Sequence, residues 1–191
     1  ERTKEYLDIS ANELQRLGLL VDKVLRISMF EEDKMELRKE PVDLKGLALE
    51  VLKSMSLQLE NAGAQITLEA PDEMYMVQAD KMHMLSVMYN LVDNAIKYSN
   101  QNPAVTLKLT NDAHAIKLMV EDNGIGIPAE FRQKVFDKFF RVPHGNTHDI
   151  KGYGLGLSYV SEVVKKHGGT IEVHASHPVG SAFVITLPVA S

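Results

Sequence analysis

The sequence predicts an α/β fold in which helices cover one face of a mixed sheet, preceded by one long helix. Alternating apolar and polar residues in Ala104–Thr110 and Ala115–Asp122 indicate two half-buried strands, joined by the turn signal Asn111-Asp112. Segments with helical periodicity lie between these strands and others. Strands interleaved with helices in this way indicate a two-layer α/β sandwich.

The composition is that of a globular protein without disulfides or thiolate metal sites. Of the 191 residues, 45% are hydrophobic, 25% are charged and none is cysteine. The formal net charge of -5 disfavours nucleic-acid binding, which usually needs a basic face. No apolar run approaches the roughly 18 residues of a membrane span. Because the chain starts at Glu1 within a helical pattern, we expect it to be a fragment of a longer protein.

Residues 1 to about 37 form the long predicted helix. Leu7, Leu14 and Val21 repeat every seven residues and give it a single apolar seam. A helix of this kind needs partner helices to bury its seam, which predicts a helical bundle. Packing of the helix on its own domain is the alternative. The bundle is favoured because the rest of the chain has the residues for a complete core of its own.

The predicted sandwich follows in the second part of the chain. Pro41 disfavours helix at the residue before it, so the predicted domains are 1–40 and 41–191. Asp43 and Asp80 precede helical patterns and are predicted N-caps. The predicted elements are helices at 44–62, 81–98 and 155–167, strands at 65–69, 104–110, 115–122, 170–175 and 181–188, a short extended piece at 75–79, and a loop-rich stretch with short helical pieces at 123–152.

The first glycine motif is Asp122-Asn123-Gly124-Ile125-Gly126-Ile127-Pro128. It follows a strand that ends in a carboxylate, and its two glycines allow the backbone to approach a ligand closely. A buried aspartate at such a place can accept a hydrogen bond from an exocyclic amine, which would select adenine over guanine. The alternative is a tight turn in which Asp122 is a simple cap.

The second glycine motif, Gly152-Tyr153-Gly154-Leu155-Gly156-Leu157, opens the helix at 155–167. Amide groups at a helix N-terminus, left accessible by glycine, form an anion site suited to phosphates. The motif is not a dinucleotide fingerprint, because no βαβ unit with an acidic residue about 20 positions later surrounds it. A Walker lysine motif is also missing.

The stretch at 132–148 lies between the glycine motifs. Its polar, glycine-containing half is a candidate lid, next to three phenylalanines that are core residues in the simplest interpretation. Lys138 and Arg141 could reach a phosphate or could be solvated. His144 and His148 would suit a metal site only with a third ligand, and the sequence offers none there.

One helix before these motifs carries polar residues on a single face. Asn90, Asn94 and Lys97 are spaced by four and three residues, so they align along the helix. The simplest interpretation is a solvated face. Asparagines are indifferent helix formers, however, and amide oxygens beside a lysine suit a site for Mg²⁺ and phosphate.

Together, the segments resemble the GHKL superfamily of gyrase, Hsp90-type chaperones, histidine kinases and MutL. NLVDNAIKYS is similar to its asparagine box, DNGIGIP and GYGLGLS to its two main glycine boxes, and FDKFFRV to a phenylalanine box. Gly180-Ser181-Ala182-Phe183 is similar to the start of its final strand. The phenylalanine box resembles the sensor histidine kinase branch, and residues 1–40 resemble the second helix of the dimerisation domain. The resemblance covers essentially the whole chain and implies the Bergerat ATP-binding fold.

The resemblance implies a site for ATP or ADP with Mg²⁺. It gives Asn90, Asn94 and Lys97 catalytic roles, with Asn94 as the metal ligand and Asn90 over the phosphates. Hydrolysing relatives typically have a glutamate base where this chain has Asn90, and an amide cannot act as a base near neutral pH. Phosphoryl transfer is therefore expected rather than hydrolysis. The implied nucleotide-binding residues are Asn90, Asn94, Lys97, Tyr98, Asp122, Gly124, Gly126, Ile127, Phe140, Arg141, Gly152, Tyr153, Gly154, Leu155, Gly156, Leu157 and Thr186.

The resemblance also implies what the chain lacks. Sensor kinases are phosphorylated on a histidine in an H-E/D-x-R-x-P-L context, and none of the seven histidines fits. The acceptor helix is expected to precede Glu1, so the fragment alone should not autophosphorylate. The implied partners are a second copy through the helical bundle and a response-regulator receiver domain, with no nucleic acid. The implied location is the cytoplasmic side of a bacterial inner membrane, with attachment through segments outside this chain. A GHKL-type ATPase and a non-catalytic scaffold are the alternatives.

Overall fold

The computed structural model describes residues 36–71, 74–99, 102–112, 114–143, 154–176 and 178–189. The chain divides into Glu1–Glu36 and Leu37–Ser191, and the fold below is that of the second unit. The predicted long helix, with its seam, lies outside the described residues. So does the part of the predicted lid from residue 144 to residue 148. The domain boundary after residue 40 stays a prediction.

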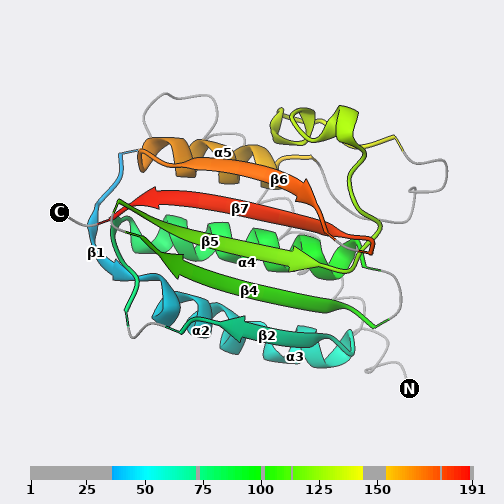
Figure 1. Ribbon diagram of the computed structural model, residues 1–191, viewed down its shortest axis with the longest axis horizontal. Coiled ribbons are helices and arrows are strands. Elements are labelled where there is room, and N and C mark those ends of the chain that lie inside the picture. The colour runs from blue at the N-terminus through cyan, green and yellow to red at the C-terminus, as the bar shows by residue number, and fades with distance from the viewer. Residues whose placement is uncertain are drawn as a thin grey trace, which may run out of the picture. The chain divides into compact units, whose positions relative to one another are not determined.

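A five-stranded sheet forms one layer of the domain (Figure 1). Its order is β2-β4-β5-β7-β6, and only the β2–β4 pair is parallel. Buried residues face one another along its middle, as in the pair Leu118 and Ile185. The mixed sheet of the sequence prediction is confirmed. The strands are β2 (Gln65–Glu69), β4 (Ala104–Asn111), β5 (Ala115–Asp122), β6 (Thr170–Ala175) and β7 (Ser181–Pro188).

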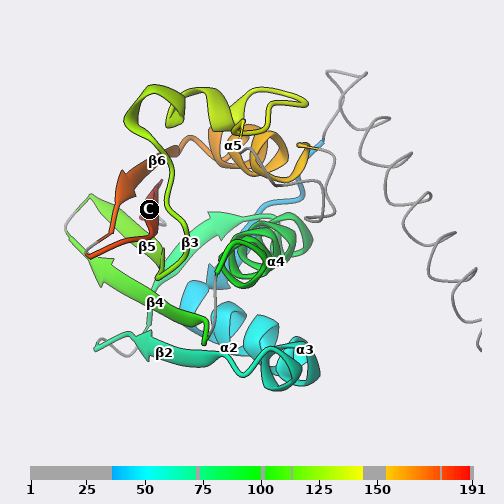
Figure 2. The same cartoon turned by 90° about the vertical axis from the view of Figure 1, so that its right-hand side faces the viewer.

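The helices form the second layer and cover one face of the sheet (Figure 2). They are α2 (Leu44–Ser54), α3 (Ser56–Asn61), α4 (Lys81–Lys97) and α5 (Gly156–Lys166). Alternate residues of β5 and β7 are buried on the side of α4, where Val87 and Leu91 have no exposed surface. The two-layer α/β sandwich is therefore confirmed, and its core lies between α4 and the central strands.

Aspartate caps fix where two helices begin. The Asp43 carboxylate accepts from the amides of Lys45 and Gly46, which starts α2. The predicted helix 44–62 is interrupted at Met55, so it becomes α2 and α3. The Ser54 hydroxyl donates to the carbonyl of Val51 at 2.8 Å, and this carbonyl also accepts from the amide of Met55 at 3.0 Å, where α2 ends.

A two-stranded ribbon leads the chain into the domain. β1 (Glu40–Asp43) pairs antiparallel with β3 (Met76–Ala79), although the sequence predicted only a helix break at β1. Next to β3, Asp80 accepts from the amide of Arg38 at 2.9 Å and from that of His83 at 3.1 Å. Burial raises the pKa of Asp80, but these hydrogen bonds outweigh it and leave the pKa below its usual value. The predicted cap of α4 is thus present and also binds the incoming chain.

His167 closes the other side of this junction. Its Nε2 accepts from the amide of Asp80 at 2.9 Å, so its Nδ1 carries the proton and donates to the carbonyl of Val163 at 2.7 Å. Burial lowers the pKa of the imidazole, which keeps it neutral in this role. The end of α5 and the start of α4 are joined through one neutral histidine.

Candidate nucleotide-binding site

Asp122 forms the centre of one half of the site. It is the last residue of β5 and only 6% exposed. Its Oδ1 accepts from the amide of Gly124 at 2.8 Å and from the amide of Ser181 at 3.1 Å. Burial raises the pKa of Asp122, the two hydrogen bonds oppose this rise, and the charge of Glu121 adds to it. Both donors use Oδ1, so Oδ2 stays able to accept a hydrogen bond from a ligand.

Gly124 lies against the end of α4. A Cβ at position 124 would meet the carbonyl oxygen of Tyr98 at 2.6 Å, and the amide of Ile125 donates to that carbonyl at 3.0 Å. The motif after β5 is therefore attached to the last turn of the helix that carries the polar face. Only glycine fits at position 124 without a shift of the backbone.

Gly180 brings β7 to the same point. A Cβ at position 180 would meet the carbonyl oxygen of Asp122 at 1.9 Å, and its φ is 145°. This close approach places the Ser181 amide on Asp122. Gly126, with a φ of 74°, also lies against Gly180. The two segments, far apart in sequence, form one backbone cradle around the carboxylate.

The other half of the site lies where α4 meets α5. Asn90 is 8% exposed, and its Nδ2 donates to the carbonyl of Ser86 at 2.7 Å. Its Oδ1 lies against the start of α5, where a Cβ at position 156 would be 2.9 Å away. Residue 155, the N-cap of α5, makes no side-chain hydrogen bond to the first turn. The polar face of α4 is thus next to the amides of a helix N-terminus, as a phosphate site requires.

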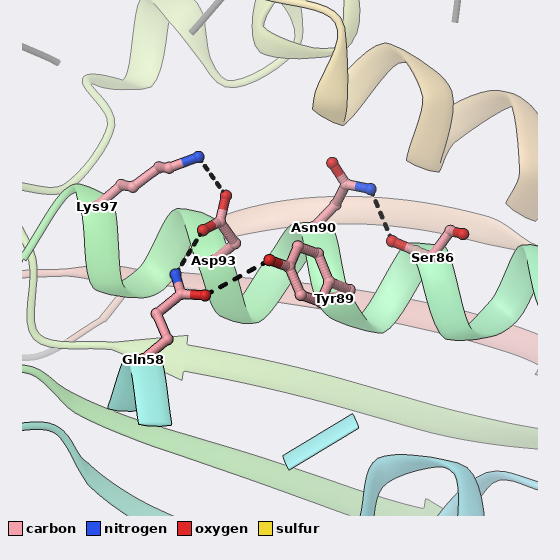
Figure 3. A network of polar contacts seen from close by, with 6 residues as sticks. All are labelled: Gln58, Ser86, Tyr89, Asn90, Asp93 and Lys97. Atoms are coloured by element: carbon pink, nitrogen blue, oxygen red, sulfur yellow. Dashed lines mark hydrogen bonds and ion pairs between the residues drawn. The ribbon is translucent and has the colours of Figure 1, made fainter. Parts of the chain in front are cut away.

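The other two residues of this face lie toward the C-terminus of α4. Asn94 is half-exposed, and its side chain makes no hydrogen bond within the described residues. Lys97 forms an ion pair with Asp93, and Asp93 accepts from Gln58 of α3 at 2.9 Å (Figure 3). The face therefore offers one unengaged amide and one held cation.

The phenylalanine segment is tied to the second glycine motif. The Phe139 amide donates to the Gly154 carbonyl at 3.0 Å, and a Cβ at position 154 would meet the Phe140 carbonyl oxygen at 2.8 Å. The Phe140 ring packs on Phe131 with centroids 5.8 Å apart. Phe139, predicted as a core residue, is 64% exposed and has a φ of 65°. The short helices η1 (Ala129–Phe131) and η2 (Lys134–Phe136) precede this contact.

Among the described residues, the predicted site residues lie in or next to these two halves, with Thr186 as the exception. Thr186 pairs with Lys117 and Thr170 on the open face of the sheet, because Phe183 and Ile185 alternate with it and face the helices. It lies apart from the others. Tyr98, Ile127, Leu155, Gly156 and Leu157 flank the two halves, Lys138 and Arg141 are exposed, and Gly152 and Tyr153 lie outside the described residues.

Sequence reasoning missed residues that act through backbone groups or across helices. Ser181 binds Asp122 by its amide, so its side-chain type gives no signal, although the preceding glycine does. Asp93 and Gln58 are 35 residues apart and meet only after folding.

The polar face of α4 offers an amide oxygen as a candidate ligand for Mg²⁺. Within the described ranges, no group of three or more His, Asp or Glu side chains could hold a metal ion. Mg²⁺ commonly keeps waters and phosphate oxygens and takes few protein ligands. The unengaged amide of Asn94 fits this need, and its role as ligand stays a prediction.

These features define a nucleotide-binding domain of the ATPase type. The chain matches the family described as histidine kinase-, DNA gyrase B-, and HSP90-like ATPase over residues 79–191, and it belongs to this family. It is 39% identical over 180 residues to the sensor protein RprX of Bacteroides fragilis. The aligned region covers 93% of this chain and 35% of the relative. It is 30% identical over 190 residues to the sensor protein kinase WalK of Staphylococcus saprophyticus. The aligned region covers 98% of this chain and 31% of that relative.

Solved structures give the same family. The structure of full-length ShkA in complex with AMPPNP has a TM-score of 0.77 at 26% identity, over 92% of this chain and 36% of that one. The histidine kinase ThkA in complex with the response regulator protein TrrA has a TM-score of 0.75 at 26% identity, over 100% of this chain and 52% of that one. The predicted GHKL fold and the kinase branch are confirmed. The chain spans about a third of the length of the curated relatives. Among the described residues, no helix has both the length and the hydropathy of a membrane span.

Proposed function

We propose that this domain binds ATP with Mg²⁺ and supplies the γ-phosphoryl group for transfer to a histidine on a dimerisation helix. The observation that carries this proposal is the position of Asn90. It faces the N-terminus of α5 with an amide in the place where hydrolysing relatives are expected to have a glutamate base. Without a base to activate water there, the site favours a nucleophile from another helix over hydrolysis.

The adenine would be read at Asp122. Its free Oδ2 would accept from the exocyclic amine of adenine, while a carbonyl of guanine at this place would face a carboxylate without a donor. The cradle holds the carboxylate by backbone amides, so its direction is set before the nucleotide arrives. Gly124 and Gly126 let the backbone around it pack closely against Tyr98 and Gly180.

The phosphates would lie between α4 and α5. The first amides of α5 point to this region without a side-chain cap, and Lys97 adds a positive charge. Asn94 would hold Mg²⁺ through its amide oxygen, and this ion would supply charge neutralisation on the phosphates. The contribution of the protein is then to position the phosphates and to offset their charge, as in other phosphoryl transfers.

The larger protein would act in two-component signalling. A second copy joined through the predicted helical bundle, and a receiver domain that accepts the phosphoryl group on an aspartate, are the proposed partners. The complex of the relative ThkA with the response regulator protein TrrA supports the second of these. The proposed location of this domain is the cytoplasmic side of a bacterial inner membrane.

The test mixes this chain with a helical bundle that supplies the acceptor histidine, in the presence of labelled ATP and Mg²⁺. We expect label on the bundle, and a loss of at least about 100-fold in its rate with Asn94→Ala. Asn111→Ala, at the exposed far end of β4, serves as the control and should keep the full rate. ATP binding without any label on the bundle, or steady hydrolysis that Asn90→Ala abolishes, would refute the proposal.

A further inference from the structure

Lys97 differs from two other ion-paired lysines, Lys81 and Lys108, in its partner. The Lys81, Lys97 and Lys108 side chains are 46%, 44% and 45% exposed, so water reaches them equally. The partners of Lys81 and Lys108 are glutamates that are 50% and 47% exposed, whereas Asp93, the partner of Lys97, is 15% exposed. Exposed pairs of flexible side chains are weakly ordered. Of these three carboxylates, the one that pairs with Lys97 is the one that the fold holds in place.

A second helix fixes the direction of this carboxylate. Asp93 Oδ1 accepts from Gln58 Nε2 at 2.9 Å, and Oδ2 accepts from Lys97. Gln58 Oε1 in turn accepts from the Tyr89 hydroxyl at 3.4 Å, so both ends of the amide are used. Figure 3 shows Gln58 reaching α4 from α3, on the side away from Asn90. Each oxygen of Asp93 has its own donor, which leaves the ammonium of Lys97 with one defined place.

This place is on the polar face of α4. Lys97 follows Asn94 by three residues and Asn90 by seven, so all three lie along one side of the helix. Figure 3 shows Lys97 and Asn90 extending from the same side of α4. Lysine has a large side-chain rotamer entropy, part of which is lost when it binds a phosphate. A lysine that is already held loses less of it.

We propose that Asp93, held by Gln58, is a positioning residue that keeps the Lys97 ammonium in place for the phosphates of the nucleotide. This inference rests on the proposed function, because phosphates are taken as the ligand of Lys97. Asp93 also brings a negative charge close to the phosphates, which opposes their binding. The proposal therefore states that Asp93 raises the affinity for the nucleotide, because the gain from holding Lys97 exceeds the repulsion between Asp93 and the phosphates.

The first test compares ligands with and without phosphates. Asp93→Asn keeps an acceptor for Gln58 but loses the charge that holds Lys97. We expect its affinity for Mg-ATP, measured by calorimetry, to fall about threefold to tenfold, as when one long side chain must be ordered on binding. Its affinity for adenosine should not change. In a Lys97→Ala background, Asp93→Asn should cause no further loss, because the lysine that it positions is absent.

Several outcomes of this test would overturn the proposal. An equal loss in the Lys97→Ala background would show that Asp93 acts independently of the lysine, and a matching loss for adenosine would show a general effect on the fold. A gain in affinity for Mg-ATP would mean that repulsion dominates. Gln58→Leu should give a smaller loss of the same kind, and Glu69→Gln, which frees Lys108, should give none.

The second test needs no nucleotide. The rate of acylation of each lysine by an amine-reactive ester can be followed by mass spectrometry of peptides. We expect Asp93→Asn to raise the rate at Lys97 about threefold or more, while Glu69→Gln changes that of Lys108 little, since exposed pairs protect weakly. An unchanged rate at Lys97 would refute the holding role. A chain that binds neither ATP nor adenosine would refute the proposed function, and the acylation result would still decide whether Asp93 holds Lys97.

Discussion

The two halves of the site are built from different parts of the chain. Around Asp122, the contacts are backbone amides and close approaches at Gly124 and Gly180, which bring β5, β7 and the end of α4 together. Along α4, side chains form the site, and a side-chain network through Asp93 holds one of them. A backbone cradle has one geometry and accepts few substitutions, whereas a side-chain face can be changed one residue at a time. The adenine half should therefore decide whether a nucleotide binds. The phosphate half should decide how much the phosphates add to its affinity.

The largest expected effect is on the adenine half. Asp122→Asn replaces the free Oδ2 by an amide group that cannot accept from the adenine amine. We expect the affinities for ATP, ADP and adenosine to fall together by about 100-fold, the loss of one charge-assisted hydrogen bond in a buried site. The preference for adenine over guanine should be lost as well. Calorimetric titration with each ligand measures both.

Asp112→Asn is the matched control for this change. Asp112 also accepts from two backbone amides, at His114 and Ala115, but it lies in the turn between β4 and β5, at the other end of these strands. Its variant should bind nucleotides normally. A loss confined to ATP and ADP in Asp122→Asn, with adenosine unaffected, would break the division of the site into two halves.

A smaller effect is expected on the stability of the cradle. Gly124→Ala would push a Cβ onto the Tyr98 carbonyl, so strand and helix must separate slightly. We expect the free energy of unfolding, from urea denaturation, to fall by about 2–3 kcal/mol, typical of overpacking against backbone.

Gly63→Ala separates this effect from that of backbone conformation alone. Gly63 has a φ of 61° but nothing within 4 Å of a Cβ, so alanine there should cost about 1 kcal/mol from strain alone. If the free energy of unfolding fell by the same amount in both variants, the close contact with Tyr98 would not be important for the cradle.

The smallest effect concerns pH. Burial raises the pKa of Asp122 in the folded state above its ordinary value of 3.8, so the folded protein binds this proton more tightly than the unfolded chain does. The contribution of Asp122 to stability is therefore fully present below pH 3.8 and is lost as the pH rises through the folded pKa. The variant Asp122→Asn does not lose stability in this way, because asparagine does not titrate.

The prediction is tested by the difference in free energy of unfolding between Asp122→Asn and the native sequence. This difference should change in favour of the variant as the pH rises from below 3.8 to 7. The other carboxylates titrate in both proteins, so their effect on the free energy of unfolding cancels in this difference. A difference that is constant with pH would mean that the cradle compensates the buried charge fully.

Much of the fold follows from local patterns. The bounds of β2, β5, β6 and β7 agree with the prediction because alternation of apolar residues and flanking turn residues mark them. The caps at Asp43 and Asp80 were predicted for the same reason, since a cap is a local hydrogen bond. The family resemblance then supplied the role expected of each motif.

The rest depends on contacts between distant residues. β1 has four residues and contains Pro41, so without its partner β3 it has the pattern of a loop. The exposed face of Thr186 could have been read from the alternation of Phe183, Ile185 and Leu187, which face the helices. The link from Gln58 to Asp93 has no signal in a single sequence, because hydrogen bonds between side chains of different helices depend on how the helices pack.

The ribbon of β1 and β3 has a mechanical consequence for the chain that leads into the domain. Val42 is buried opposite Val77, so a slip of one residue would turn it to water and would also withdraw the Arg38 amide from Asp80. Sliding is thus blocked by packing and by a hydrogen bond at once. The Asp80 carboxylate thus ties the incoming chain at residue 38 and the first turn of α4 to the same point.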